Sequence, residues 1–154
     1  MPNFTHQRYP DEPIDVLHVE DNERDIRLTR EAFTATDRET TLHVVNDGDD
    51  TVDFLRRQGQ YDSAPRPDLV LLDLNLPGRD GHDVLETIED TPQLRRLPVI
   101  VLTGSNRSEN IVTCYRTHAN AYVSKPPTLE EFVSLVTALE AFWLEHAQLP
   151  PNSA

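Results

Sequence analysis

The 154-residue chain has one cysteine, one lysine and no long apolar run. Cys114 alone cannot form a disulfide within the chain, and the N-terminus lacks the basic and apolar segments of a secretory signal. The longest apolar runs, such as residues 69–72 and 99–102, are far shorter than the ~20 residues that cross a bilayer. These absences predict a soluble, cytoplasmic protein without a membrane segment.

Positive charge is also scarce, because 14 lysines and arginines face 27 acidic residues and leave a formal net charge of -13. A field of this sign repels phosphate backbones and anionic lipids. The six histidines are scattered without the spacing of metal ligands. The composition therefore argues against a nucleic-acid or membrane partner.

Short apolar runs alternate along the chain with segments of helical periodicity. Strands are predicted at residues 14–19, 40–45, 68–73, 99–102 and 121–124. Five helices are predicted: from an N-cap at Asn22 to about residue 37, from residue 47 or 48, after Pro77 and Gly78, over 108–118, and over 129–146.

This alternation predicts an α/β fold, because parallel strands need crossover connections and helices supply them. We expect a flavodoxin-like three-layer sandwich, with a five-stranded parallel sheet of order 2-1-3-4-5 and five helices. One domain would span residues 13–146, between an N-terminal tail at 1–12 and a C-terminal tail at 147–154.

Polar side chains follow four of the predicted strands where each strand ends. They are Glu20 and Asp21, Asp73, Thr103, and Lys125. Each alone has an ordinary explanation as a helix cap, a strand end or a solvated loop residue. Ligands of such sheets bind outside the carboxyl ends of the strands, so the five together favour one shared site. Lys125 supports this most, since the chain otherwise avoids lysine.

Four motifs around these residues resemble the receiver domain of response regulators. They are ValGluAspAsn at 19–22, LeuLeuAspLeuAsnLeuProGlyArgAspGly at 71–81, LeuThrGly at 102–104 and TyrValSerLysPro at 122–126. The resemblance covers about residues 13–146 and is closest in kind to stand-alone, chemotaxis-regulator-like receivers. The ValValAsnAspGly segment at 44–48 and the aromatic last helix are similar to receivers paired with phytochrome-type sensor kinases.

The resemblance implies a single-domain response regulator of a two-component phosphorelay, a signalling phosphoprotein and not an enzyme. Asp73 would accept the phosphoryl group. Mg²⁺, the implied cofactor, would be held by Glu20, Asp21, Asp73 and the backbone carbonyl of Asn75, since magnesium prefers oxygen ligands.

The resemblance also assigns the remaining site residues. Lys125 and Thr103 would contact phosphoryl oxygens and so replace water around the charged group. The peptide bond before Pro126 would be cis and would turn Lys125 toward the site. Thr103 and Tyr122 would form a switch pair that changes the face made by the fourth helix, the fifth strand and the fifth helix.

The implied phosphoryl donor is a sensor histidine kinase or a phosphotransfer protein, and the downstream target is a protein that the sequence does not identify. The last predicted helix carries more apolar surface than one face packed on a sheet requires. Phe142 and Trp143, with Tyr115, would suit a homodimer face, although packing on the core explains them equally well.

Two other functions compete with this interpretation. A phosphohydrolase of the haloacid dehalogenase type also forms an aspartyl phosphate, but it needs a second acid two residues after the nucleophile, where this chain has Asn75. A pure interaction module without phosphorylation would not need all five site residues.

The excess of acidic residues and the near absence of lysine favour a salt-adapted, haloarchaeal source, although an acidic surface without salt adaptation would give the same composition. We expect the midpoint of thermal unfolding to rise as KCl is raised from dilute buffer to molar concentration, because the salt screens repulsion among the carboxylates. Circular dichroism melts test this, and full stability in dilute buffer would contradict it.

Overall fold

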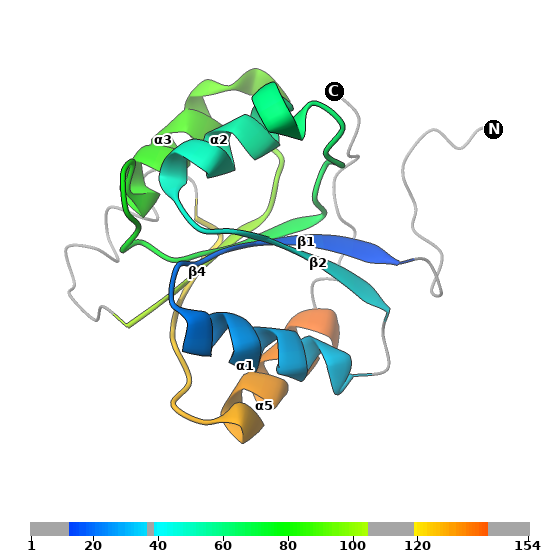
Figure 1. Cartoon of the computed structure of the whole chain (residues 1–154). Coiled ribbons are helices and arrows are strands. Elements are labelled where there is room, and N and C mark those ends of the chain that lie inside the picture. The colour runs from blue at the N-terminus through cyan, green and yellow to red at the C-terminus, as the bar shows by residue number, and fades with distance from the viewer. Residues whose placement is uncertain (1–12, 37–38, 105–118, 142–154) are drawn as a thin grey trace.

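A five-stranded parallel sheet lies between two layers of helices in the computed structural model, which describes residues 13–36, 39–104 and 119–141 (Figure 1). The strands are β1 (Ile14–Val19), β2 (Thr40–Val45), β3 (Leu69–Leu72), β4 (Val99–Thr103) and β5 (Ala121–Ser124). Their order is β2-β1-β3-β4-β5, and every pair of neighbours is parallel. The predicted flavodoxin-like sheet is confirmed.

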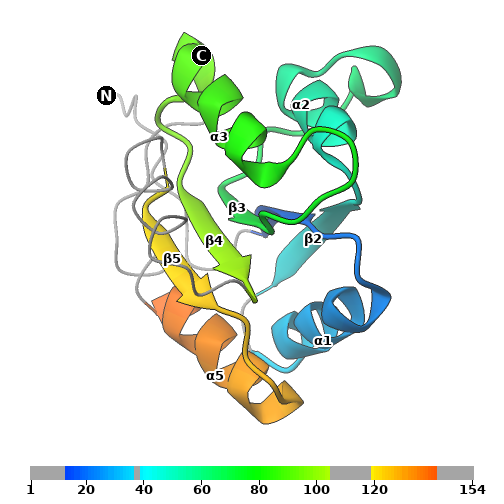
Figure 2. The ribbon, with the colours of Figure 1, turned by 90° about the vertical axis from the view of Figure 1, so that its left-hand side faces the viewer.

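Helices α1 (Glu23–Thr34) and α5 (Leu129–Leu139) cover one face of the sheet, and α2 (Gly48–Arg56) and α3 (Gly81–Asp90) cover the other (Figures 1 and 2). Short 3₁₀ helices follow α2 and α3, at η1 (Gly59–Tyr61) and η2 (Pro92–Leu94). No described helix is both long and apolar enough to cross a membrane.

The described part of the chain contains four α-helices instead of the five predicted. The helix predicted at 108–118 lies outside the described residues, as do the two predicted tails. The first helix ends at Thr34, earlier than predicted. The N–H of its C-cap residue, Ala35, donates to the carbonyl of Glu31. The last helix is described only to Leu139, with two further residues of wider helical turn after it.

Each of the four helices begins at a side chain that caps its first turn. Asn22, Asp47, Asp80 and Thr128 accept hydrogen bonds from backbone N–H groups three residues ahead, as helix N-caps do. All four caps lie within eight residues of a strand's carboxyl end, so short connections gather at one edge of the sheet.

The core has two halves, one on each face of the sheet, because successive side chains of a strand point to opposite faces. Leu17, Val70 and Val101 pack toward α2 and α3, whereas Val16, Leu71 and Ile100 pack toward α1 and α5. Burial on both faces explains why the central strands are continuous apolar runs in the sequence.

Gly81 lets α3 begin directly against the loop that follows β3. A Cβ atom at this position would lie 2.6 Å from Leu74 Cα and 2.7 Å from the Asp73 carbonyl oxygen. The Gly81 N–H also donates to the Leu74 carbonyl at 3.0 Å. The absence of a side chain at Gly81 therefore fixes the backbone that leads out of β3.

Replacing Gly81 with alanine should lower the free energy of unfolding by about 1–3 kcal/mol, because the new methyl group overlaps backbone that cannot give way cheaply. Urea denaturation measures this. Gly104→Ala is the matched control, since a Cβ there meets no atom of the described residues within 4 Å, and a change below about 0.5 kcal/mol is expected for it. Equal effects of the two substitutions would contradict the close approach.

Candidate functional site

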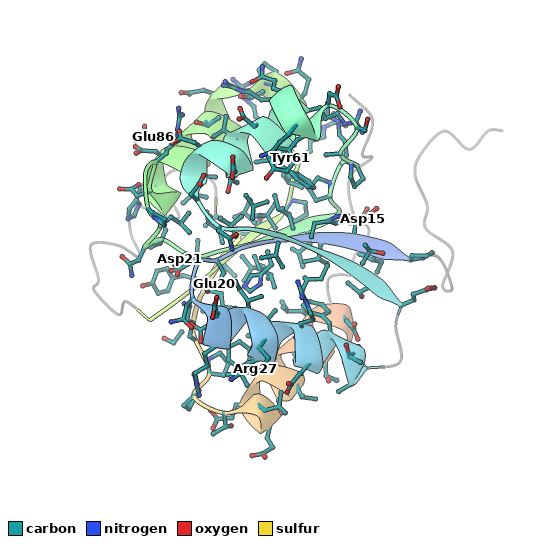
Figure 3. The ribbon with its side chains drawn as sticks, in the orientation of Figure 1. Asp15, Glu20, Asp21, Arg27, Tyr61 and Glu86 are labelled. Carbon is teal, nitrogen blue, oxygen red and sulfur yellow. The ribbon has the colours of Figure 1, made fainter. Side chains whose placement is uncertain are left out.

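The polar residues predicted to converge lie at the carboxyl edge of the sheet. Glu20 and Asp21 follow β1 and lie beside the first turn of α1 (Figure 3). Asp73 follows β3, and Lys125 follows β5. Thr103 is the last residue of β4 and pairs with Ser124 of β5. Its backbone is therefore at the same edge, while its side chain lies outside the described part.

Three acids at this edge could hold a metal ion. Carboxylate oxygens of Glu20, Asp21 and Asp73 lie within 4.8 Å of one another. Glu20 and Asp73 are buried, and Asp21 is exposed. Hard divalent cations such as Mg²⁺ and Mn²⁺ prefer oxygen ligands of this kind. The residues present therefore fit the predicted metal.

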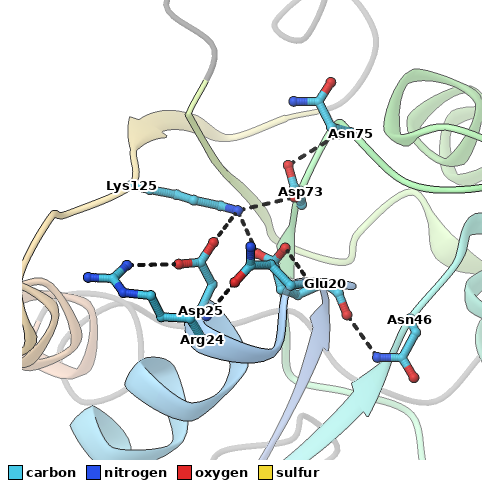
Figure 4. Close-up of polar contacts among 8 residues, drawn as sticks. Glu20, Arg24, Asp25, Asn46, Asp73, Asn75 and Lys125 are labelled. Atoms are coloured by element: carbon cyan, nitrogen blue, oxygen red, sulfur yellow. Dashed lines mark hydrogen bonds and ion pairs between the residues drawn. The ribbon is translucent and has the colours of Figure 1, made fainter.

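The ammonium group of Lys125 joins the acids from the opposite side. Its Nζ lies 2.8 Å from Glu20 Oε1, 2.8 Å from Asp25 Oδ2 and 3.2 Å from Asp73 Oδ2 (Figure 4). A lysine has three N–H donors, so these three carboxylates can occupy all of them. The lone lysine of the sequence is thus held between elements that are distant in the chain.

Burial and a neighbouring acid raise the proton affinity of Glu20. Burial first, and then a hydrogen bond with Asp73, raises the pKa of Glu20 to about 8, against the opposing effect of Lys125. Burial alone would lower the pKa of Lys125, but the hydrogen bonds that it donates to Asp25 and Glu20 outweigh this effect and raise that pKa. Glu20 therefore holds a proton more readily than a free carboxyl does, while Lys125 stays charged.

A histidine lies beneath the site on the face covered by α1 and α5. His18 is 1% exposed, and its Nδ1 has no hydrogen-bond partner among the residues described. Burial, and secondly the charge of Lys125, lowers the pKa of His18 to about 4. A neutral imidazole therefore separates the charged edge from the apolar core.

Backbone hydrogen bonds fix the acids in place. The Glu20 N–H donates to the Val45 carbonyl at 2.9 Å, and the Asn46 amide donates to the Glu20 carbonyl at 2.9 Å. The Asn75 N–H donates to Asp73 Oδ1 at 3.1 Å (Figure 4). Asp73 is thus hydrogen-bonded through one carboxylate oxygen to the loop after β3 and through the other to Lys125.

An open cavity of about 530 Å³ adjoins this cluster. Asp21, Asn75 and His82 are among its lining residues, together with the loop between β3 and α3. The acids are therefore reached from solvent beside Asp21, which leaves room for an incoming group.

The predicted cis peptide bond before Pro126 is wrong for this structure. No peptide bond in residues 13–36, 39–104 and 119–141 is cis. The long lysine stem brings Nζ to three carboxylates while the Lys125–Pro126 bond is trans, so no reversal of the chain is needed.

Tyr122 is partly buried and packs against the half of the core that faces α2 and α3. It lies opposite Val101 in the sheet, and Val101 is two residues before Thr103 in β4. Because the Thr103 side chain and residues 105–118 lie outside the described part, the switch pair stays a prediction.

Asp25 was not predicted as a site residue. It lies in the first turn of α1, where an acid is an ordinary complement to the helix dipole. Its contact with Lys125 joins residues 100 positions apart. The available signal was its position four residues after Asp21, in a turn that begins at the carboxyl edge of the sheet.

Known proteins are similar to this chain in sequence and in fold. The family model described as the response regulator receiver domain matches residues 16–137. The response regulator Rcp1 of Synechocystis is 41% identical over 138 residues, which cover 90% of this chain and 94% of Rcp1.

Two solved structures are similar in the same way. The phosphorylated cyanobacterial phytochrome response regulator RcpA has a TM-score of 0.86 and 41% identity, covering 90% of this chain and 99% of RcpA. The Mn²⁺-bound form of Rcp1 has a TM-score of 0.83 and 40% identity, with the same coverage. The chain belongs to the response regulator receiver domain family of two-component signalling.

Proposed function

We propose that Asp73 is the phospho-acceptor of this receiver and that it takes its phosphoryl group from a sensor histidine kinase or a phosphotransfer protein. The observation that carries this is the position of the Asp73 carboxylate, which is one of the three clustered acids and lies 3.2 Å from the ammonium group of Lys125. A phosphorylated relative, RcpA, supports the same chemistry.

In this reaction a carboxylate oxygen of Asp73 forms a bond to phosphorus while the bond from phosphorus to the donor's imidazole nitrogen breaks. Lys125, 3.2 Å from Asp73 Oδ2, would place its charge on a phosphoryl oxygen. The Asn75 N–H orients the other carboxylate oxygen. Thr103 would donate its hydroxyl to a second phosphoryl oxygen.

Glu20, Asp21 and Asp73 would hold Mg²⁺, with the backbone carbonyl of Asn75 as a further ligand. The bound cation would neutralise negative charge between the acids and the phosphoryl group. The proposed chemistry is limited to phosphorylation and dephosphorylation of Asp73 itself, so the protein acts as a signalling component and not as an enzyme on other substrates.

The proposed kinase is of the phytochrome type, as the similarity to RcpA suggests. Phosphorylation would change the surface near Tyr122 and α5 through the Thr103–Tyr122 pair. A second copy of this chain or another partner protein would bind that face. We place this relay in the cytoplasm, and we retain salt adaptation as part of the proposal.

Acetyl phosphate with Mg²⁺ should add one phosphoryl group to the intact protein. Asp73→Asn should abolish the addition, because an amide is not a nucleophile of this kind. Intact-mass spectrometry measures the product. Asp90→Asn, on the last residue of α3, is the control and should react as the wild type does. An Mg²⁺-dependent adduct of unchanged yield in Asp73→Asn would contradict the assignment.

Mg²⁺ affinity should fall as the pH is lowered from about 9 to about 6. Glu20 has a pKa of about 8 in the metal-free protein, so below that pH the cation must displace a proton, at up to about tenfold in affinity per pH unit. Titration calorimetry in buffers of different ionisation enthalpy detects the released proton.

The protonation of Glu20 also fixes the sign of the stability change. Its folded pKa lies above the unfolded value, so its contribution to stability is present at acid pH and is lost as the pH rises through about 8. Glu20→Gln should weaken Mg²⁺ binding and flatten its dependence on pH. Proton release that is equal in the wild type and in Glu20→Gln would contradict this role.

A further inference from the structure

We propose that Asp25 restrains phosphorylation of Asp73 by holding Lys125 as a competing counter-ion. Asp25 would thus be a positioning residue that acts through the lysine and sets how readily the site accepts a phosphoryl group. This inference rests on the function proposed above and names a residue that regulates it.

The contact between Asp25 and Lys125 is as short as any that the lysine makes with the site. Asp25 Oδ2 lies 2.8 Å from Nζ, equal to the distance from Glu20 and shorter than the 3.2 Å from Asp73 (Figure 4). The Asp25 side chain is 14% exposed and that of Lys125 is 17% exposed, so water screens the pair only partly. Lys125 is therefore bound at least as closely to Asp25 as to the phospho-acceptor.

Asp25 differs from the other two partners of Lys125 because it is not one of the three clustered acids. Glu20 and Asp73 have carboxylate oxygens in the cluster that fits a metal ion, whereas Asp25 does not. When a cation binds the carboxylates of Glu20 and Asp73, it competes with Lys125 for them. The Asp25 carboxylate is not in that cluster, so the cation does not compete for it. Asp25 is then the acid that retains the lysine.

The first turn of α1 holds Asp25 in this position. Its N–H donates to the Asn22 cap at 3.0 Å, and the Arg24 guanidinium lies 3.6 Å from Asp25 Oδ1. Arg24 also donates to the Pro127 carbonyl at 3.0 Å, two residues after Lys125. The Asp25–Lys125 and Arg24–Pro127 contacts thus tie the start of α1 to the segment between β5 and α5.

A phosphoryl group on Asp73 requires the ammonium group of Lys125, which Asp25 already binds. Without a cation, the three N–H donors of Lys125 are matched by three carboxylates. With a cation on Glu20 and Asp73, Asp25 remains the acid that competes with the phosphoryl dianion for the lysine. Asp25 also adds negative charge beside the approaching dianion. Removing the charge of Asp25 while keeping its shape should therefore make the lysine available and reduce repulsion.

The test compares initial rates of phosphorylation by acetyl phosphate at saturating Mg²⁺. Asp25→Asn should react about three- to tenfold faster than the wild type, since one partly shielded charge is removed at close range. Asp25→Glu keeps the charge and should stay near the wild-type rate. Glu23→Gln is the matched control, because it removes one negative charge from the same helical turn, and it should change the rate less than about twofold.

A second measurement reports on the lysine without phosphorylation. Lys125 is the only lysine in the chain, so acylation by an amine reagent followed by peptide mass spectrometry reads one side chain apart from the N-terminal amine. Asp25→Asn should increase the acylation rate of Lys125 severalfold, whereas Glu23→Gln should leave it unchanged. Asp25→Ser should behave as Asp25→Asn does and replaces it if that variant does not fold.

The outcomes separate this inference from the function on which it rests. A wild-type protein that takes no phosphoryl group on Asp73 would overturn the proposed function. A wild type that reacts normally, together with an Asp25→Asn variant of equal or lower rate, would overturn the role of Asp25 alone. Unchanged acylation of Lys125 in Asp25→Asn and Asp25→Ser would also overturn it.

Discussion

The structure of the site depends on one ammonium group placed among acids that repel one another. Glu20, Asp25 and Asp73 come from three different segments, and each lies within 3.2 Å of Lys125 Nζ. Bringing buried carboxylates together is unfavourable unless a cation and hydrogen bonds offset the cost. A single lysine meets that requirement in the metal-free protein, and it leaves an excess of negative charge that favours a divalent cation.

The parallel sheet makes this arrangement possible by ordering its strands differently in space and in sequence. β1 lies between β2 and β3, so the acids after β1 and β3 are neighbours at one edge. β5 closes the other side of that edge and contributes the lysine. Apolar side chains buried on both faces hold the strands in register, and capped helices keep the connections short. The topology thus places the site residues, while burial determines how strongly their charges interact.

The sequence predicted the strands well and the contacts of the site less completely. The second and fifth strands have the predicted bounds, since apolar runs between polar turns mark a buried strand. Convergence at the strand ends followed from the parallel topology. Asp25 could not be recognised because its partner is distant in the chain and its position suits a helix start equally well. The prediction of a cis bond before Pro126 was wrong, because an X–Pro sequence is compatible with either isomer and does not by itself select one.

The separation of Lys125 from its partners has a consequence for the growing chain. During synthesis the acids of β1, α1 and β3 emerge well before the lysine, which comes 52 positions after Asp73 and 100 after Asp25. An unfinished chain therefore holds carboxylates that lack their cation. Contacts that close such long loops form slowly, and the cluster around Lys125 cannot be completed until the fifth strand has joined the sheet.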